Sequence, residues 1–199
     1  MSRLPDTTTT SSALDMKEFD YELDYKSLDF TDPDTRSLYR IGRGEQGVLL
    51  VRPYTDDICA HWRFVDETTA RKSSTKIYQM FLEFKSKRDF IGMDMARKFL
   101  EMGFTRARRY ANHASGRKYD EVSGDTRPQE KDWRTNEKSK AAAVFKEVRD
   151  LAAYDKTYQE MRREWRSNES SYAVRVDALA ATSNVTRQRY SRKRTNVSG

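Results

Sequence analysis

Residues 89–112 read DFIGMDMARKFLEMGFTRARRYAN, and the interpretation of the chain works outward from this stretch. Asp89 is a favourable helix N-cap. Apolar side chains follow it at helical spacing, namely Phe90, Met93, Ala96, Phe99 and Leu100. Gly103 is well placed to end this helix in the left-handed conformation, and Thr105 can cap a second helix over 106–112. The stretch therefore predicts two helices joined at a glycine, a layout similar to a helix-turn-helix pair.

Basic side chains gather on the second predicted helix and just after it. From Arg97 to Lys118 there are seven bases against the single acid Glu101, a net charge of +6. Arg106 and Arg109 share one helical face with either Asn112 or His113, and such a face can contact phosphates when it is exposed. We therefore expect DNA or RNA binding by Arg97, Arg106, Arg108, Arg109, Asn112, Arg117 and Lys118. A helical hairpin with an ordinary solvated charged surface is the alternative interpretation.

Charge is also segregated along the rest of the chain. The 199 residues contain 38 Lys and Arg against 31 Asp and Glu, a net charge of +7. The segment from Ala13 to Asp34 has a net charge of −6, and residues 162–199 have a net charge of +6. Clustered positive charge is typical of proteins with polyanionic partners. One hypothesis is that the acidic segment folds over the basic surface and competes with nucleic acid.

The cysteine content and the hydropathy limit other classes of function. Cys59 is the only cysteine, which excludes a disulfide or a cysteine-rich zinc site within one chain. The sequence shows no apolar signal segment and no run of about 18 apolar residues. We therefore expect no membrane partner and an intracellular location, cytoplasmic or nuclear. No metal site is predicted, while cofactors and oligomeric state stay open.

A glycine-rich segment, Gly42–Gly47, has the form G-x-G-x-x-G. A dinucleotide-binding loop of this form needs a helix directly after it, but here a strand-like run from Val48 to Val51 and then Pro53 follow. The lysine strand and catalytic loop of a protein kinase are also missing. We therefore interpret the segment as a hairpin loop that connects two short strands, with Arg43, Glu45 and Gln46 at its tip.

The remaining patterns favour an α+β fold, with a small antiparallel sheet at the hairpin packed by several helices. Strands are predicted at 39–41, 48–51 and 61–64. Helices are predicted at 67–85, capped by Asp66 or Thr68, and at 136–166, where one break is allowed. The predicted organisation is a disordered extension at 1–15, a single α+β domain at 16–166 and a mostly disordered basic tail at 167–199.

An enzyme that acts on a nucleic-acid or phosphorylated substrate, for example a nuclease, is the alternative function. Its candidate catalytic residues are His113, Glu45, His61 and Lys118. Whether these four side chains converge cannot be read from the sequence, so catalysis stays open. A third class is an interaction protein that docks through the helix beginning at residue 136, although its heptad order is poor.

Three blocks of the sequence resemble a known family. They are Gly42–Leu49, Pro53–Phe64 and Asp94–His113. The resemblance covers about residues 17–165 and is to the family catalogued as domain of unknown function 4385. It implies one α+β domain with an extension at each end. It implies no activity, so the functional expectation depends on the residues themselves.

Overall fold

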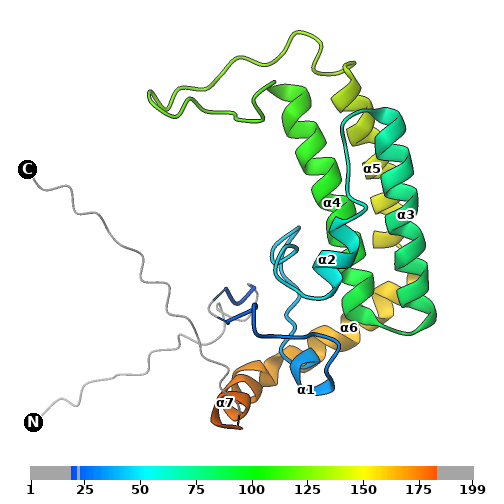
Figure 1. The fold of residues 1–199 in the computed structure, drawn as a ribbon, viewed down its shortest axis with the longest axis vertical. Helices are drawn as coiled ribbons and strands as arrows, with labels where there is room; N and C mark the ends of the chain where they lie inside the picture. Colours follow the sequence, from blue (N-terminus) through cyan, green and yellow to red (C-terminus); the bar gives the residue numbers. More distant parts are fainter. Residues whose placement is uncertain (1–18, 22, 183–199) are drawn as a thin grey trace, which may run out of the picture.

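Three long helices pack against one another to form the centre of the molecule. They are α3 (Glu67–Ser86), α4 (Phe90–Asn112) and α5 (Glu137–Ala153), and each contacts the other two (Figure 1). The computed structural model describes residues 19–21 and 23–182. The other elements are the helices α1 (Pro33–Arg36), α2 (Tyr54–Cys59), α6 (Lys156–Asn168) and α7 (Tyr172–Thr182) and the 3₁₀ helix η2 (Glu169–Ser171).

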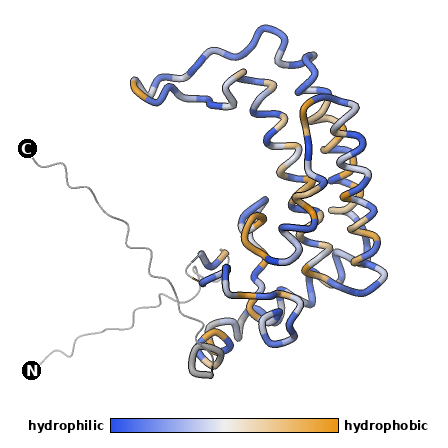
Figure 2. Tube along the Cα trace, viewed as in Figure 1, coloured by the Kyte–Doolittle hydropathy of each residue, from blue (hydrophilic) through white to orange (hydrophobic). Residues whose placement is uncertain are grey.

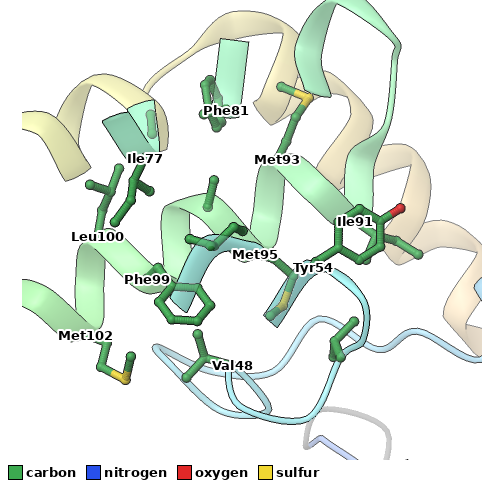
Figure 3. Close-up of a cluster of buried hydrophobic side chains, with 14 of the residues drawn as sticks. Val48, Tyr54, Ile77, Phe81, Ile91, Met93, Met95, Phe99, Leu100 and Met102 are labelled. Carbon is green, nitrogen blue, oxygen red and sulfur yellow. The ribbon is translucent and has the colours of Figure 1, made fainter. Parts of the chain in front are cut away.

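Side-chain caps and apolar stripes explain where the long helices lie. Asp66 accepts a hydrogen bond from the Thr69 amide at 2.7 Å, and Asp89 accepts one from the Gly92 amide at 3.3 Å. These caps satisfy amides that have no partner inside the helix. Asp89 was the predicted cap of α4, and for α3 the structure selects Asp66 over the alternative Thr68. The predicted apolar residues of α4 are fully or almost fully buried. Figure 3 shows Ile77 of α3 beside Leu100 of α4 in this core.

The chain breaks once between α5 and α6, within the helix predicted at 136–166. Tyr154 ends α5, and the carboxylate of Asp155 accepts a hydrogen bond from the Tyr158 amide at 3.0 Å to begin α6. Helix α6 then leaves the three-helix centre and supports the N-terminal part of the chain. The indole of Trp165 donates to the Tyr39 carbonyl at 2.9 Å.

The predicted α+β fold with an antiparallel sheet is wrong, because the described residues are helical and form no sheet. Pairing between extended segments is limited to isolated bridges, such as that between Tyr119 and Thr126. The run from Val48 to Val51 forms consecutive turns, with the Leu50 amide bonded to the Gly47 carbonyl at 2.9 Å. Val48 and Val51 are buried, and Figure 3 shows Val48 pointing toward Phe99 of α4. Tertiary packing thus overrides the β propensity of this run.

The predicted helix-turn-helix pair is also wrong, because α4 continues without a break through Gly103. A Cβ at Gly103 would lie 2.3 Å from Cδ1 of Phe145 in α5. The glycine therefore allows α4 and α5 to approach closely instead of ending a helix. Thr105, predicted as an N-cap, lies inside α4 and donates from its hydroxyl to the Met102 carbonyl at 3.2 Å.

An aromatic segment at the N-terminal side covers part of the core. Phe19, Tyr25 and Phe30 are buried and stack in a row, with ring centroids 5.0 Å and 5.9 Å apart. The phenol of Tyr25 donates to the Asp20 carbonyl at 2.6 Å. The rings of Phe19, Tyr25 and Phe30 thus face the core.

Helical structure extends beyond the predicted C-terminal end of the domain. Helix α6 crosses the predicted boundary at residue 166, and α7 continues to Thr182. The extension at 1–15 and residues 183–199 of the predicted tail lie outside the described part of the chain. None of the described helices combines the length and the apolar character needed to cross a membrane.

Candidate functional site

A cleft of about 690 Å³ lies between the last turns of α4 and the beginning of the loop over residues 113–136. It is lined by Phe104, Thr105, Arg108, Arg109, Asn112, His113, Gly116, Arg117, Lys118 and Tyr119. Four of these ten residues are basic and none is acidic. Figure 1 shows the loop extending beyond the end of α4 before the chain returns to α5. We call this site the basic cleft.

Hydrogen bonds fold the beginning and the end of the loop onto α4. The ring nitrogen Nδ1 of His113 lies 3.1 Å from the Pro128 carbonyl oxygen. The Asn112 carbonyl accepts from the Glu130 amide at 2.9 Å, and the Glu130 carboxylate accepts from the Ala114 amide at 3.1 Å. The loop wall of the basic cleft is therefore anchored to the helix wall.

Between these anchors the loop forms a short hairpin. The Arg127 amide donates to the Lys118 carbonyl at 2.8 Å, and the Asp120 amide donates to the Asp125 carbonyl at 2.8 Å. An ion pair of 2.9 Å joins Arg127 and Asp120. Figure 2 shows that the loop is hydrophilic along most of its length, so an apolar core of its own does not hold it.

The cations of the basic cleft differ in how they are held. The guanidinium of Arg108 lies 4.5 Å from the centroid of the Trp133 ring and donates to the Trp133 carbonyl at 3.3 Å, which fixes its position. Arg109 is exposed at the end of α4. Arg117 pairs with Glu121, but the two side chains are 56% and 68% exposed, so this pair contributes little.

Two polar groups of the basic cleft have hydrogen-bonding capacity to spare. Since a carbonyl oxygen only accepts, Nδ1 of His113 must be the protonated nitrogen, which leaves Nε2 as the acceptor in the neutral ring. The side-chain oxygen Oδ1 of Asn112 is buried and has no hydrogen-bond partner in the part of the chain that the structure describes. Nε2 of His113 can therefore accept a hydrogen bond from a bound group, whereas Oδ1 of Asn112 is shielded from solvent.

The structure brings together five of the seven residues predicted to bind nucleic acid. Arg108, Arg109, Asn112, Arg117 and Lys118 all line the basic cleft. The other two lie elsewhere. Arg106 is half-buried and is not among the lining residues, and Arg97 is committed to an internal ion pair.

The four catalytic candidates are only partly brought together. His113 and Lys118 line the basic cleft. Glu45 reaches its edge, where its carboxylate accepts from the Thr105 hydroxyl at 2.8 Å. His61 is exposed after α2 and does not line the cleft. Within residues 19–21 and 23–182, no group of three or more His, Cys, Asp or Glu side chains is placed to hold a metal ion.

The ion pair of Arg97 belongs to a buried polar network in the first half of α4. Asp94 is fully buried and accepts hydrogen bonds from the hydroxyls of Tyr39 and Tyr158, the latter at 2.6 Å. Nε of Arg97 lies 3.0 Å and Nζ of Lys98 3.6 Å from its carboxylate. Burial alone would raise the pKa of Asp94, but the two cations outweigh burial and hold its pKa well below the usual range.

The same two cations also hold the glycine-rich segment. Arg97 donates to the Gly44 carbonyl at 3.3 Å, and Lys98 donates to the Gln46 carbonyl at 2.8 Å. Burial lowers the pKa of Lys98 to about 8, although the neighbouring Asp94 opposes this shift. Gly44 has a positive φ of 56°, which glycine adopts without strain. The segment is therefore a turn fixed to α4, and Glu45 is its link to the basic cleft.

A second pocket, of about 380 Å³, lies beside the basic cleft and was not predicted. It is lined by Trp62, Arg63, Phe64, Val65, Tyr110 and Lys138. Tyr110 follows Arg109 directly, and a Cβ at Gly116 would lie 2.8 Å from Cζ of its ring, so the ring forms a wall between the two sites. The aromatic and basic composition of His61–Phe64 was the available signal, but we interpreted it as a strand. We call this site the aromatic pocket.

The described part of the acidic N-terminal segment lies away from the basic cleft. The Asp20 carboxylate accepts from the Tyr172 hydroxyl at 3.0 Å, next to α7. Figure 1 shows this segment at the opposite end of the molecule from the loop over residues 113–136. Residues 19–21 and 23–34 therefore do not cover the basic cleft, and the rest of the segment is outside the described residues.

Comparison with known proteins bears out the resemblance found in the sequence. The family model described as Domain of unknown function (DUF4385) matches residues 20–168. No curated protein and no solved structure matches the chain. The matched range contains both the basic cleft and the aromatic pocket.

Proposed function

The chain belongs to the DUF4385 family, and we propose that it binds nucleic acid through the basic cleft. The observation that carries this proposal is the composition of the cleft, where four bases and no acid are among the ten lining residues. Since the family assigns no activity, the argument depends on the charges and their placement.

The cations of the basic cleft are suited to phosphate. Binding of Lys and Arg to a nucleic-acid backbone releases condensed counterions, and this supplies most of the sequence-independent affinity. Arg108 is held by Trp133 before any ligand binds, so less side-chain freedom is lost on binding. Arg117 can exchange its exposed partner Glu121 for a phosphate at small cost.

The proposal is narrower than the expectation from the sequence. Arg97 is excluded, because its side chain is only 13% exposed and its guanidinium is paired with Asp94. Arg106 is excluded because it is not among the lining residues. The proposed contacts are Arg108, Arg109, Asn112, Arg117 and Lys118. Three of these residues, Arg108, Arg109 and Asn112, lie on α4 and two, Arg117 and Lys118, lie in the loop, so the proposed surface is not a recognition helix alone.

The test is binding of labelled DNA and RNA followed by fluorescence anisotropy over about 50 to 200 mM salt. Four phosphate contacts predict a slope of log affinity against log salt of about −3. The double variant Arg109→Glu and Arg117→Glu should lose most of the binding at low salt.

The matched control is the double variant Lys156→Glu and Arg163→Glu, in which two exposed bases of α6 are reversed. It changes the net charge of the protein by the same amount but lies at the other end of the molecule (Figure 1). It should keep most of the affinity. Equal losses in the two double variants, or no binding of DNA or RNA by the unchanged protein at low salt, would contradict the proposal.

A nuclease is the second candidate, and the placement of His113 is what favours it. Its hydrogen bond to Pro128 leaves Nε2 as an acceptor in a site that also contains Lys118. A neutral imidazole of this kind can act as a general base. The same labelled oligonucleotides, incubated with and without Mg²⁺, test this candidate. Cleavage that His113→Ala abolishes would support it, whereas binding without cleavage would leave binding as the function.

A further inference from the structure

Next to the basic cleft lies a pocket whose walls are aromatic and whose charges are positive. Trp62, Phe64 and Tyr110 supply three aromatic rings, and Arg63 and Lys138 supply two cations. None of the six lining residues is acidic. Its volume of about 380 Å³ falls within the range of about 300–1,000 Å³ that is usual for sites that bind small ligands.

The rings of the aromatic pocket leave apolar surface uncovered. The ring centroids of Trp62 and Phe64 are 4.8 Å apart at 50°, and those of Phe64 and Tyr110 are 6.0 Å apart at 41°. These tilted arrangements are not parallel stacks. Tyr110 is 38% and Val65 is 63% exposed, so part of this apolar surface faces solvent. A flat apolar group can lie against such a surface.

Lys138 connects the rings to the charge of the site. Its ammonium lies 5.2 Å from the Phe64 ring centroid and 6.0 Å from that of Tyr110. It also donates to the Phe64 carbonyl at 3.2 Å, which holds the segment after α2 against the beginning of α5. The aromatic pocket thus has a fixed shape and a positive rim.

The aromatic pocket adjoins the basic cleft, with the Tyr110 ring between them. Arg109 faces the cleft, and the next residue, Tyr110, lines the pocket. Its ring contacts Gly116, which belongs to the loop wall of the cleft. A second exposed aromatic side chain, Tyr119, lines the cleft itself. The ammonium nitrogen of Lys118 lies 5.3 Å from the centroid of its ring. Both sites therefore combine cations with an exposed aromatic ring, and they lie on either side of Tyr110.

We infer that the ligand is a single-stranded nucleic acid, with its phosphates in the basic cleft and an unpaired base in the aromatic pocket. The inference rests on the proposed function and adds that the nucleic acid is single-stranded and not a duplex. Proteins that bind single strands combine a basic groove with aromatic side chains on which bases stack. A duplex can offer its phosphates to the cleft, but its bases are already stacked and paired and cannot enter the pocket. Both DNA and RNA have bases with this chemistry.

The first experiment compares affinities for an oligothymidine and an oligouridine of about 12 nucleotides with those for a duplex of the same length. The single strands should bind more tightly than the duplex. Replacement of Tyr110 by Leu should weaken single-strand binding by about 5- to 150-fold, the range expected for the loss of one stacking contact. It should leave duplex binding nearly unchanged. Tyr110→Phe keeps the ring and should keep the affinity.

The matched control is Tyr154→Leu, the same replacement at a tyrosine that is 79% exposed at the end of α5. It should change neither affinity. A second experiment uses the unchanged protein, so its result does not depend on whether a variant folds. Oligothymidine in which thymine is replaced by a photoreactive 5-iodouracil should cross-link to the unchanged protein at Trp62, Phe64 or Tyr110, as mapped by mass spectrometry.

The outcomes separate this inference from the proposed function. If single strands and duplex bind equally, Tyr110→Leu has no effect and the cross-links avoid the aromatic pocket, the inference is wrong. In that case a loss of binding in the Arg109 and Arg117 variants would still support the proposed function. If the protein binds neither form at low salt, both are wrong. Preferential single-strand binding with cross-links in the aromatic pocket supports both.

Discussion

The two halves of α4 both carry basic side chains but use them in opposite ways. In the first half, Lys98 is buried and Arg97 is nearly so, with exposed side-chain fractions of 0% and 13%, and both face Asp94. In the second half, Arg109 is exposed and contributes to a cleft without an acid among its lining residues. The first pair holds the fold together, and the second set is available to a ligand. Charge density in a sequence therefore does not distinguish a structural cation from a binding cation, but the partner of each cation does.

The difference follows from one acidic residue and its spacing. Asp94 precedes Arg97 by three positions and Lys98 by four, so all three side chains share one helical face. Two tyrosine hydroxyls complete the coordination of its carboxylate. From Phe104 to Tyr119 the sequence has five bases and no acid, so no acid at helical spacing is available to pair with these bases.

The largest expected effect is the loss of Asp94. Asp94→Ala leaves the buried cations without their counter-charge and removes the acceptor of two tyrosine hydroxyls. The free energy of unfolding should fall by about 3–5 kcal/mol, as is usual when one partner of a buried ion pair is removed. Urea denaturation measures this change.

The matched control is Asp56→Ala, which removes an ion pair with Arg52 whose side chains are 61% and 42% exposed. This variant should lose less than about 1 kcal/mol. If the two variants lose similar amounts, the network around Asp94 does not have the structural role that separates it from the basic cleft.

A second, smaller effect is a dependence of stability on pH caused by Lys98. Its pKa is lowered from 10.5 to about 8 in the folded protein. Between these values the unfolded chain binds more protons than the folded protein, so the free energy of unfolding should increase as the pH rises. Between pH 8 and 9.5 the increase should be on the order of 1 kcal/mol.

The raised pKa values of Tyr39 and Tyr158 limit this increase at higher pH. Above about pH 10 the unfolded tyrosines lose protons that the folded ones retain, so stability falls again. Lys98→Met should abolish the increase between pH 8 and 9.5 and leave the fall above pH 10. Urea denaturation at several pH values measures both, and an unchanged profile in Lys98→Met would show that Lys98 is not the group that titrates.

The sequence predicted the long helices better than it predicted what joins them. The caps Asp66 and Asp89 and the apolar stripe of α4 are local signals, and they were interpreted correctly. The run after Gly47 was wrongly predicted as a strand, because its valines are buried by contact with α4, which a local pattern does not contain. Gly103 was wrongly predicted as a helix end, since its partner Phe145 is distant in the sequence.

The candidate site could be predicted only in part, because local signals again identify neighbours along one helix but not contacts between distant parts of the chain. Arg108, Arg109 and Asn112 are neighbours on one helix, so their proximity to one another was predictable. The place of Arg97 was signalled by Asp94 three positions earlier, a pairing that the count of charges overlooked. The contact of the segment after α2 with Tyr110 joins distant parts of the chain, so the aromatic pocket could be found only in the structure.

The smallest expected effect on stability is at the basic cleft, and it tests the other half of the comparison. The double variant Arg109→Gln and Arg117→Gln removes two exposed cations without introducing an acid. Each substitution should change the free energy of unfolding by less than about 0.5 kcal/mol, as is usual for surface positions. Binding should respond differently, because two phosphate contacts are lost and the salt slope should become less steep by about 1.5. Urea denaturation and anisotropy titrations measure the two quantities on the same samples.

A loss of stability comparable to that of Asp94→Ala would mean that these cations also hold the fold, and the distinction between the two halves of α4 would no longer stand. If the free energy of unfolding is kept and the salt slope becomes less steep, the cations of the basic cleft act on a ligand. A cation that neither supports the fold nor binds a polyanion would leave both quantities unchanged when it is removed.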